Sequence, residues 1–473
     1  MTIPVKLLYF IFELIKIVFI KEQTMGSFIE RPRYSCAVAG ALAAVNAIKG
    51  AVPILHASQG CGGTTTAAIN GPSGFLGSGY CGGSSVPSSG INEKQIVFGG
   101  ATRLEEQIKS TAEIIDADLF VVISGCTAEL IGDDIKSVVN DYNENPLGGP
   151  KLIYTNGAGF KGDTFYGYDA LLQTLITDYV EPASEKKRGY VNLWGIPPAL
   201  DVFWEGNIIE IRRILTALGL KVNSFFTIDD SLAGIRAAAQ AELNIVASPV
   251  NGIGAAELFK EVHGVDYIST DLPIGAKATE SFVLTIAERL GLDKKAVGKF
   301  IEKENEKFYH FFNRIGDAYC DIDLQRYTVI IGDATYASAL TRFVTHELGW
   351  IPGLVVITDQ VFDEQKPAIV DRFVDTLEKP DETVVFETDS SLVSEHLSRR
   401  WPQNDGGKYY EPFSPAFVLG SRLDRDFADS IKAAHLSVTY PVSNRPILDR
   451  EYAGYRGGLR LIEDIYAGLL NNR

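Results

Sequence analysis

The chain has 473 residues, 46% of them apolar, and a formal net charge of −16. This length and apolar content predict two or three globular domains and exclude a disordered chain. The acidic balance argues against nucleic acid as a partner, because a phosphate backbone binds basic surfaces and no cluster of Lys and Arg is present.

Residues 1–25 form an apolar N-terminal extension that differs from the rest of the chain. Its LLYFIFELIKIVFI run is interrupted by Glu13 and Lys16 and is short for a membrane span. No small-residue cleavage site follows, which weakens the signal-peptide interpretation. An interfacial helix is one alternative; we prefer the hypothesis that translation starts at Met25. With five cysteines and no clear secretory signal, we expect a cytoplasmic protein without disulfides or a membrane partner.

Residues 26–185 are predicted to form a first α/β domain. Apolar runs near Val52–Leu55, Leu119–Ile123 and Leu152–Tyr154 have the length of buried strands, and helical or Gly-rich segments separate them. This alternation is typical of a parallel sheet. Between Cys61 and Ile91 the composition is rich in Gly, Ser and Thr, and we expect no regular element there. The segment is either a flexible surface insertion or a loop that covers a bound group.

Three cysteines of this domain lie in separate Gly-flanked turns: YSCAVAGA at Cys36, HASQGCGGTTT at Cys61 and VVISGCTAELIGDD at Cys126. The turns at Cys61 and Cys126 follow apolar strands, so these residues are expected at the carboxyl end of a sheet, where ligands bind. A helix N-terminus at the same place would stabilise a thiolate. Each cysteine alone could simply pack as a small apolar side chain. Together they favour metal or cluster ligation, with ligands gathered by the fold.

A second α/β domain is predicted over residues 186–320 and a third over 321–440, before a C-terminal helical segment over 441–473. Helix and strand patterns alternate in both, and residues 277–316 are interpreted as long solvated helices. The fold class is therefore α/β, with three Rossmann-like, doubly wound domains and parallel sheets. GDATYA, which starts at Gly332, resembles a nucleotide-binding turn only weakly, because it lacks the G-x-G-x-x-G pattern.

Other catalytic signatures are absent from the sequence. It contains no P-loop, no H-E-x-x-H and no G-x-S-x-G. His56 precedes Cys61 by five positions, and we interpret it as a hydrogen-bonded residue at a strand end rather than a ligand. Asp133 and Asp134 could bind a cation, but they are expected to complement a helix dipole or to form an interface salt bridge.

Motifs along nearly the whole chain resemble component 1 of nitrogenase and of nitrogenase-like reductases, the β-type subunit more than the α-type. They are SQGC ending at Cys61, IVFGG ending at Gly100, GC-x3-LIGDDI beginning at Gly125, and GYRGGLRLIEDI beginning at Gly454. In that family, three cysteines from each subunit hold an [8Fe-7S] P-cluster across the α/β interface. The resemblance therefore implies ligand roles for Cys36, Cys61 and Cys126, with a simpler [4Fe-4S] centre as an alternative. It assigns none to Cys81 or Cys320.

The resemblance also implies partners: a homologous α subunit in an α2β2 heterotetramer, and an ATP-dependent iron protein that docks near Phe98. From the residues alone, Phe98 would be expected in the core. The sequence departs from molybdenum-type β subunits at TNGAGFKG, where Gly159 stands in place of a serine that can ligate the oxidised P-cluster. The spacing from Cys61 to Cys126 is also longer than in typical β chains of the family and closer to that of α chains. This leaves room for a divergent nitrogenase-like system.

Three functions are consistent with these observations. The first is a β-like subunit that relays electrons from the iron protein through the P-cluster to the catalytic metallocofactor of the α subunit, in nitrogen fixation. The second is a nitrogenase-like reductase of another substrate, such as a tetrapyrrole precursor or a methylthio-alkane. The third is a scaffold for cofactor assembly. A complete set of three cysteine turns favours the relay over the scaffold.

Overall fold

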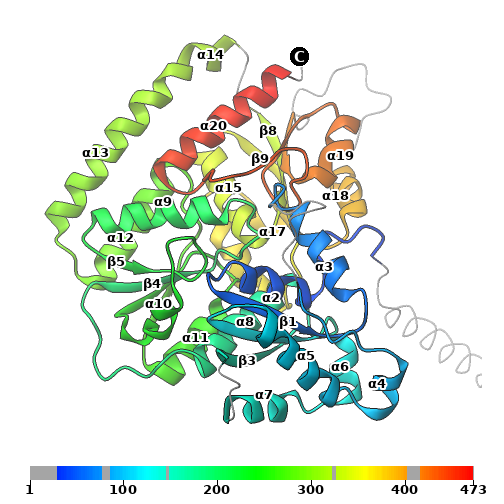
Figure 1. The fold of residues 1–473 in the computed structure, drawn as a ribbon. Helices are drawn as coiled ribbons and strands as arrows, with labels where there is room; N and C mark the ends of the chain where they lie inside the picture. Colours follow the sequence, from blue (N-terminus) through cyan, green and yellow to red (C-terminus); the bar gives the residue numbers. More distant parts are fainter. Residues whose placement is uncertain (1–28, 77–85, 145–148, 322–325, 402–415, 472–473) are drawn as a thin grey trace, which may run out of the picture.

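A computed structural model describes residues 29–76, 86–144, 149–321, 326–401 and 416–471, and three wholly parallel sheets flanked by helices make up its framework (Figure 1). The N-terminal extension and Cys81 lie outside the described residues. In the part of the chain that is described, no helix is both long and apolar enough to cross a membrane.

The first sheet has the strand order β1-β2-β3. Its strands are β1 (Ala51–His56), β2 (Leu119–Ser124) and β3 (Lys151–Asn156). Successive residues of a strand point to opposite faces, and β2 is buried on both. One face packs against α2 (Ala37–Asn46) and α8 (Thr164–Asp178), the other against α5 (Ala101–Ile114) and α7 (Ile135–Glu144). The shorter helices of this region are α3 (Cys61–Asn70), α4 (Glu93–Phe98) and α6 (Cys126–Ile131).

The second sheet has the order β5-β4-β6-β7. Its strands are β4 (Tyr190–Trp194), β5 (Lys221–Asn223), β6 (Leu243–Val246) and β7 (Tyr267–Ser269). The helices of this part are α9 (Trp204–Ala217), α10 (Leu232–Arg236), η1 (Ala238–Gln240), α11 (Ile253–His263), α12 (Gly275–Leu290), α13 (Lys294–Phe312), η2 (Asn313–Ile315) and α14 (Gly316–Asp321). The prediction of solvated helices suits α13, which is mostly exposed; it is wrong for α12, whose apolar face is buried against α15 and α20.

The third sheet has the order β10-β9-β8-β11-β12. From β8 the chain first adds β9 and β10 on one side and then β11 and β12 on the other, as in doubly wound folds. Its strands are β8 (Tyr327–Gly332), β9 (Ile351–Ile357), β10 (Val384–Phe386), β11 (Phe417–Gly420) and β12 (Ala434–Ser437). The remaining helices are α15 (Ala334–His346), α16 (Lys366–Val370), η3 (Asp371–Phe373), α17 (Pro380–Thr383), η4 (Ser390–Leu392), α18 (Val393–Arg400), η5 (Arg422–Asp424), α19 (Arg425–Ser430) and α20 (Gly454–Asn471). The α/β class with parallel sheets is confirmed. The domain boundaries stay predictions.

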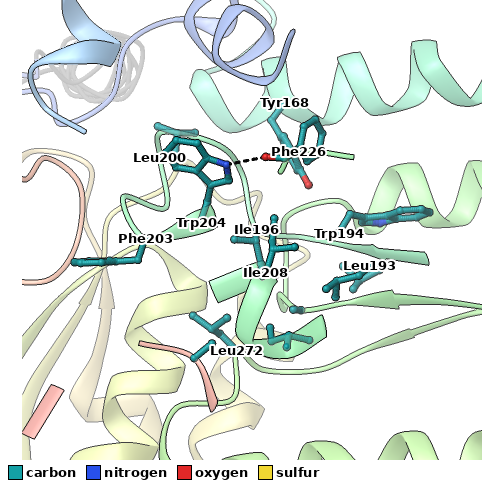
Figure 2. Close-up of a cluster of buried hydrophobic side chains, with 14 of the residues drawn as sticks. Tyr168, Leu193, Trp194, Ile196, Leu200, Phe203, Trp204, Ile208, Phe226 and Leu272 are labelled. Atoms are coloured by element: carbon teal, nitrogen blue, oxygen red, sulfur yellow. Dashed lines mark hydrogen bonds between the residues drawn. The ribbon is translucent and has the colours of Figure 1, made fainter. Parts of the chain in front are cut away.

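Aromatic packing joins the first sheet's helix layer to the second sheet (Figure 2). Tyr168 of α8 lies against Phe226, with ring centroids 5.7 Å apart, and its hydroxyl accepts a hydrogen bond from the N–H of Gly195 just after β4. The indole of Trp204 donates to the carbonyl oxygen of Phe226. These buried rings hold α8, and with it the first sheet, in a fixed position relative to the second.

One element contradicts the sequence analysis. Residues 61–70 form the helix α3, although the segment after Cys61 is predicted to be irregular. Gly and Thr have low helix propensity, but Thr65 and Ile69 are buried, and Gly60 before the helix takes a left-handed conformation that starts it directly at Cys61. Tertiary packing outweighs propensity here.

Candidate iron-sulfur site

All three predicted ligand cysteines lie at helix N-termini. Cys36 is the N-cap of α2, whereas Cys61 and Cys126 are the first residues of α3 and α6. The unpaired N–H groups of a helix N-terminus carry partial positive charge, which favours an anionic sulfur. All three cysteines are free thiols. The local structure therefore presents three sulfurs in the setting that suits thiolate ligands.

Gly159 lies where the turns of Cys36 and Cys126 meet. A Cβ atom at this glycine would lie 2.8 Å from Cys36 Cβ, 3.7 Å from Cys36 Sγ and 3.4 Å from Cys126 Sγ. The Gly159 N–H also donates a hydrogen bond to Cys126 Sγ over 3.1 Å. Cys36 is held on this side by a backbone bridge to Asp163, the N-cap of α8. Two of the three sulfurs are thus brought together from positions 90 residues apart in the sequence.

Cys61 belongs to the same group. Burial raises the pKa of its thiol, and the nearby Cys36 and Cys126 raise it further. The hydroxyl of Ser58, in the turn of Cys61, bonds the hydroxyl of Thr127, the residue after Cys126, so these two turns lie side by side. Crowded thiolates repel one another, and cations between them remove this repulsion.

The cysteine site is partly accessible to solvent. No three His, Cys, Asp or Glu side chains among the described residues are arranged to hold one ion. Cys36 and Cys61 are half-buried, and Cys126 is exposed. The site is open on one side. The ligand roles themselves stay a prediction.

A carboxylate fixes α6 beside the ends of two strands. Glu129 accepts hydrogen bonds from Ser124 Oγ, Tyr154 Oη and Asn156 Nδ2. Desolvation would raise the pKa of Glu129, but these donors outweigh it and the pKa is lowered. Because Glu129 lies one helical turn after Cys126, the network sets the orientation of that cysteine. Sequence analysis missed it, although a glutamate three residues after a turn cysteine was visible.

An exposed apolar surface lies on α4. The exposed fractions of Ile96, Val97 and Phe98 are 49%, 70% and 83%. The interpretation of Phe98 as core, drawn from the residues alone, is wrong, whereas the surface position implied by the family resemblance agrees with the structure.

His56 and Asp133 form a buried pair. His56 is the last residue of β1, and its Nε2 lies 2.9 Å from Asp133 Oδ2. The expectation of a hydrogen-bonded strand-end histidine is confirmed. For Asp133 the expected dipole or interface role is wrong, because its carboxylate binds His56 and the N–H of Gly100 inside the chain. Asp134 accepts from the N–H of Ser137 in the first turn of α7.

The GDATYA turn is a structural strand-to-helix connection. Asp333 caps α15 by accepting hydrogen bonds from the N–H groups of Thr335 and Tyr336. Near the carboxyl ends of the same sheet's strands, Arg33 pairs with Asp424 and the hydroxyl of Tyr34 bonds that of Thr358. The segment leading into Cys36 is therefore anchored at the edge where a doubly wound sheet would bind a ligand.

Cys320 is in α14, which Figure 1 places far from α2, α3 and α6. That Cys320 is not a ligand stays a prediction. Cys81 lies outside the described residues.

Comparison with known proteins identifies relatives of the chain. The family model described as nitrogenase component 1 type oxidoreductase matches residues 36–470. The chain is 24% identical to the nitrogenase molybdenum-iron protein beta chain of Methanococcus maripaludis, over 95% of this chain and 96% of that one. It is 27% identical to the nitrogenase vanadium-iron protein beta chain of Trichormus variabilis, over 57% of this chain and 60% of the relative.

Two further matches extend the comparison. Identity to a light-independent protochlorophyllide reductase subunit of Heliobacterium modesticaldum is 23%, over 80% of this chain and 68% of the relative. A solved structure of nitrogenase Cp1 at pH 6.5 superposes with a TM-score of 0.78 at 19% identity, covering 94% of each chain. This structural likeness supports the fold.

Proposed function

The chain belongs to the nitrogenase component 1 type oxidoreductases, and we propose that it is the β-like subunit of such an enzyme. In this role it relays electrons from an iron protein to the catalytic metallocofactor of a partner α subunit. The observation that carries the proposal is the meeting of three cysteine turns, each at a helix N-terminus. Cys36 and Cys126 approach each other at Gly159, and Ser58 in the turn of Cys61 bonds Thr127 beside Cys126.

The residues present fit an iron-sulfur cluster. Three thiols lie at helix N-termini in turns that contact one another, and a main-chain N–H is directed at one sulfur. Hydrogen bonds to cluster sulfurs tune reduction potentials. When bound, such a cluster accepts and passes on single electrons. Cys36, Cys61 and Cys126 would hold it, and the Glu129 network keeps Cys126 in place.

Three thiolates from one chain are too few to enclose an eight-iron cluster, and the exposure of Cys126 leaves one side open. We therefore propose that a homologous α subunit supplies the remaining ligands, within an α2β2 assembly. The shared interface is expected to be of the obligate type and to bury more than about 2,000 Å². The iron protein is proposed to dock on the exposed surface of α4 around Phe98.

Two observations favour a second candidate. The chain matches the protochlorophyllide reductase relative over 80% of its own length, and Gly159 cannot supply the serine ligand of molybdenum-type β subunits. A nitrogenase-like reductase of another substrate is therefore the alternative. Assays of the purified complex with its iron protein, using dinitrogen, protochlorophyllide and methylthio-alkanes in parallel, distinguish the two.

The experiment that tests the relay is cysteine replacement in the complex expressed with its neighbouring genes. Cys36→Ala, Cys61→Ala and Cys126→Ala should each remove iron and visible absorbance, because thiolates are the principal ligands of such centres. Cys81→Ala and Cys320→Ala are the matched controls and should retain both. Equal iron content in wild type and Cys126→Ala would rule out the assignment, and a stable monomer with a full iron complement would rule out a shared cluster.

A further inference from the structure

The helix α4 carries three exposed apolar side chains, those of Ile96, Val97 and Phe98, yet burial of its own side chains does not hold it in place. None of the side chains of residues 93–98 is buried. A helix of six residues is also far too short to be stable by itself. Its position must therefore be set at its two ends.

His56 reaches both flanks of α4. On one side, Nδ1 lies 2.9 Å from Oγ of Ser89, which precedes the helix. On the other, Nε2 lies 2.9 Å from Oδ2 of Asp133, whose Oδ1 accepts a 2.7 Å hydrogen bond from the N–H of Gly100, just after the helix. One imidazole thus connects the segments that enter and leave α4.

The direction of each hydrogen bond follows from the chemistry of the groups. A carboxylate only accepts, so Nε2 of His56 carries the hydrogen and donates it to Asp133. The other ring nitrogen then accepts from the Ser89 hydroxyl. Burial lowers the pKa of His56 and the Asp133 carboxylate only partly offsets this, which favours the neutral ring with a single tautomer. His56 and Ser89 are almost wholly buried, so water does not compete for these bonds.

The backbone of His56 is also hydrogen-bonded to a cysteine turn. The main-chain oxygen of His56 accepts a hydrogen bond from the N–H of Gly125, the residue before Cys126, over 2.9 Å. Four residues separate His56 from Cys61 along the chain. A shift of His56 would therefore move α4 relative to the cysteine turns.

We infer that His56 and Asp133 are positioning residues, which clamp both flanks of α4 and so hold Phe98 at a fixed place relative to the three cysteine turns. The inference rests on the proposed function, in which an iron protein docks on α4 and passes electrons toward these turns. Neither residue touches the docking partner in this scheme. Both act through the backbone of residues 89–100.

The test compares variants of His56 in the intact complex. His56→Leu removes both side-chain hydrogen bonds at similar volume, and His56→Gln retains an N–H that can reach Asp133. A control is His263→Leu, because the half-buried ring of His263 likewise makes a hydrogen bond, to the carbonyl oxygen of Ile176 on α8, away from α4. Hydrogen exchange of residues 92–100 reports the clamp directly, whatever the partner is.

We expect exchange in residues 92–100 to be about tenfold faster in His56→Leu, because a hydrogen bond to a charged group is lost. The apparent KM for the iron protein should rise about tenfold for the same reason. The maximal rate, the iron content and reduction of the complex by dithionite, which needs no docking, should remain at wild-type levels. In His56→Gln, the exchange rate and the KM should return most of the way to the wild-type values. In His263→Leu, neither quantity should change.

Each failure has a distinct meaning. Unchanged exchange in His56→Leu overturns the clamp. Faster exchange with an unchanged KM overturns the positioning role, and so does a loss of iron that parallels the rise in KM. A wild-type complex that accepts electrons from dithionite but never from an iron protein contradicts the proposed function instead, while the exchange measurement still decides the clamp.

Discussion

The main-chain N–H of Gly159 donates a 3.1 Å hydrogen bond to Sγ of Cys126. This contact exists because the turn after β3 passes so close to two cysteines that a side chain has no room. A donor that belongs to the backbone cannot be removed by rotation of a side chain, so it directs a permanent dipole at the sulfur.

Gly159→Ala tests this close approach. The added Cβ would lie 2.8 Å from Cys36 Cβ, which forces the turns of Cys36 and Cys126 apart. We expect a several-fold lower iron content in the assembled complex, measured by metal analysis and visible absorbance. The control is Gly71→Ala, whose Cβ would meet nothing within 4 Å. Wild-type iron content in Gly159→Ala would contradict the packing argument.

Gly40→Ala tests the crossing of α2 and α8. A Cβ at Gly40 would lie 1.7 Å from the carbonyl oxygen of Thr164, so the two helices could not keep their present distance. Overpacking of this kind costs about 1–3 kcal/mol or more, and a lower thermal unfolding midpoint should reveal it. Gly298→Ala on α13 meets nothing within 4 Å. That variant should instead gain about 0.5–1 kcal/mol from helix propensity.

Arg33→Met should weaken the anchor of the segment that leads into Cys36. The Arg33–Asp424 pair is buried, with side-chain exposures of 0% and 2%. Removing one partner leaves a buried charge without compensation, which costs about 3–5 kcal/mol. Urea denaturation followed by circular dichroism measures this loss. Arg399→Ala, which breaks the exposed Arg399–Glu395 pair, should cost less than about 1 kcal/mol. Similar losses in the two variants would argue against a buried anchor.

Asp389 should make stability depend on pH in the acid range. Desolvation would raise the pKa of Asp389, but N–H donors from Ser391, Glu30 and Arg31 lower it to about 2. Because the pKa of Asp389 is lower in the folded state than in the unfolded state, its carboxylate stabilises the folded protein. This contribution to the free energy of unfolding is fully present above the unfolded pKa of about 4 and is lost as pH falls toward 2.

The measurement is the free energy of unfolding at several pH values. Asp389→Asn should lower it at pH 6 and flatten its decline between pH 4 and pH 2. Asp363→Asn is the control: the hydrogen bond from Lys366 lowers the pKa of Asp363, but this carboxylate is exposed, so the pH profile should change far less than in Asp389→Asn. Parallel acid profiles for wild type and Asp389→Asn would show that these hydrogen bonds do not stabilise the folded state.

The strands and their order of appearance could be predicted from the sequence. Parallel strands covered on both faces are near-continuous apolar runs, and such runs are present at β2 (LFVVI), at β8 (VII) and, apart from Pro53, at β1. The cysteine turns could be recognised for the same reason, because Cys61 and Cys126 directly follow such strands. The N-terminal end of α3 could not be located, since this helix has no side-chain cap and is rich in Gly and Thr.

Contacts between distant segments were decided only by the tertiary structure. Arg33 and Asp424 are 391 positions apart, and His56 and Asp133 are 77 apart. Neither pair has a local pattern, because a hydrogen bond depends on where the backbone brings two groups and not on their spacing in the chain. The exposure of Phe98 was likewise not predictable from local sequence, because an aromatic residue in an apolar run is expected in the core. In the structure Phe98 is exposed, and the hydrogen bonds of His56 and Asp133 to the flanks of α4 hold the helix in this position. The sequence alone determined which residues could bind a cluster. The close approach of Gly159, Cys36 and Cys126 was decided by the tertiary structure. It depends on the packing of α2 against α8, because that crossing brings Cys36 to the edge of the first sheet.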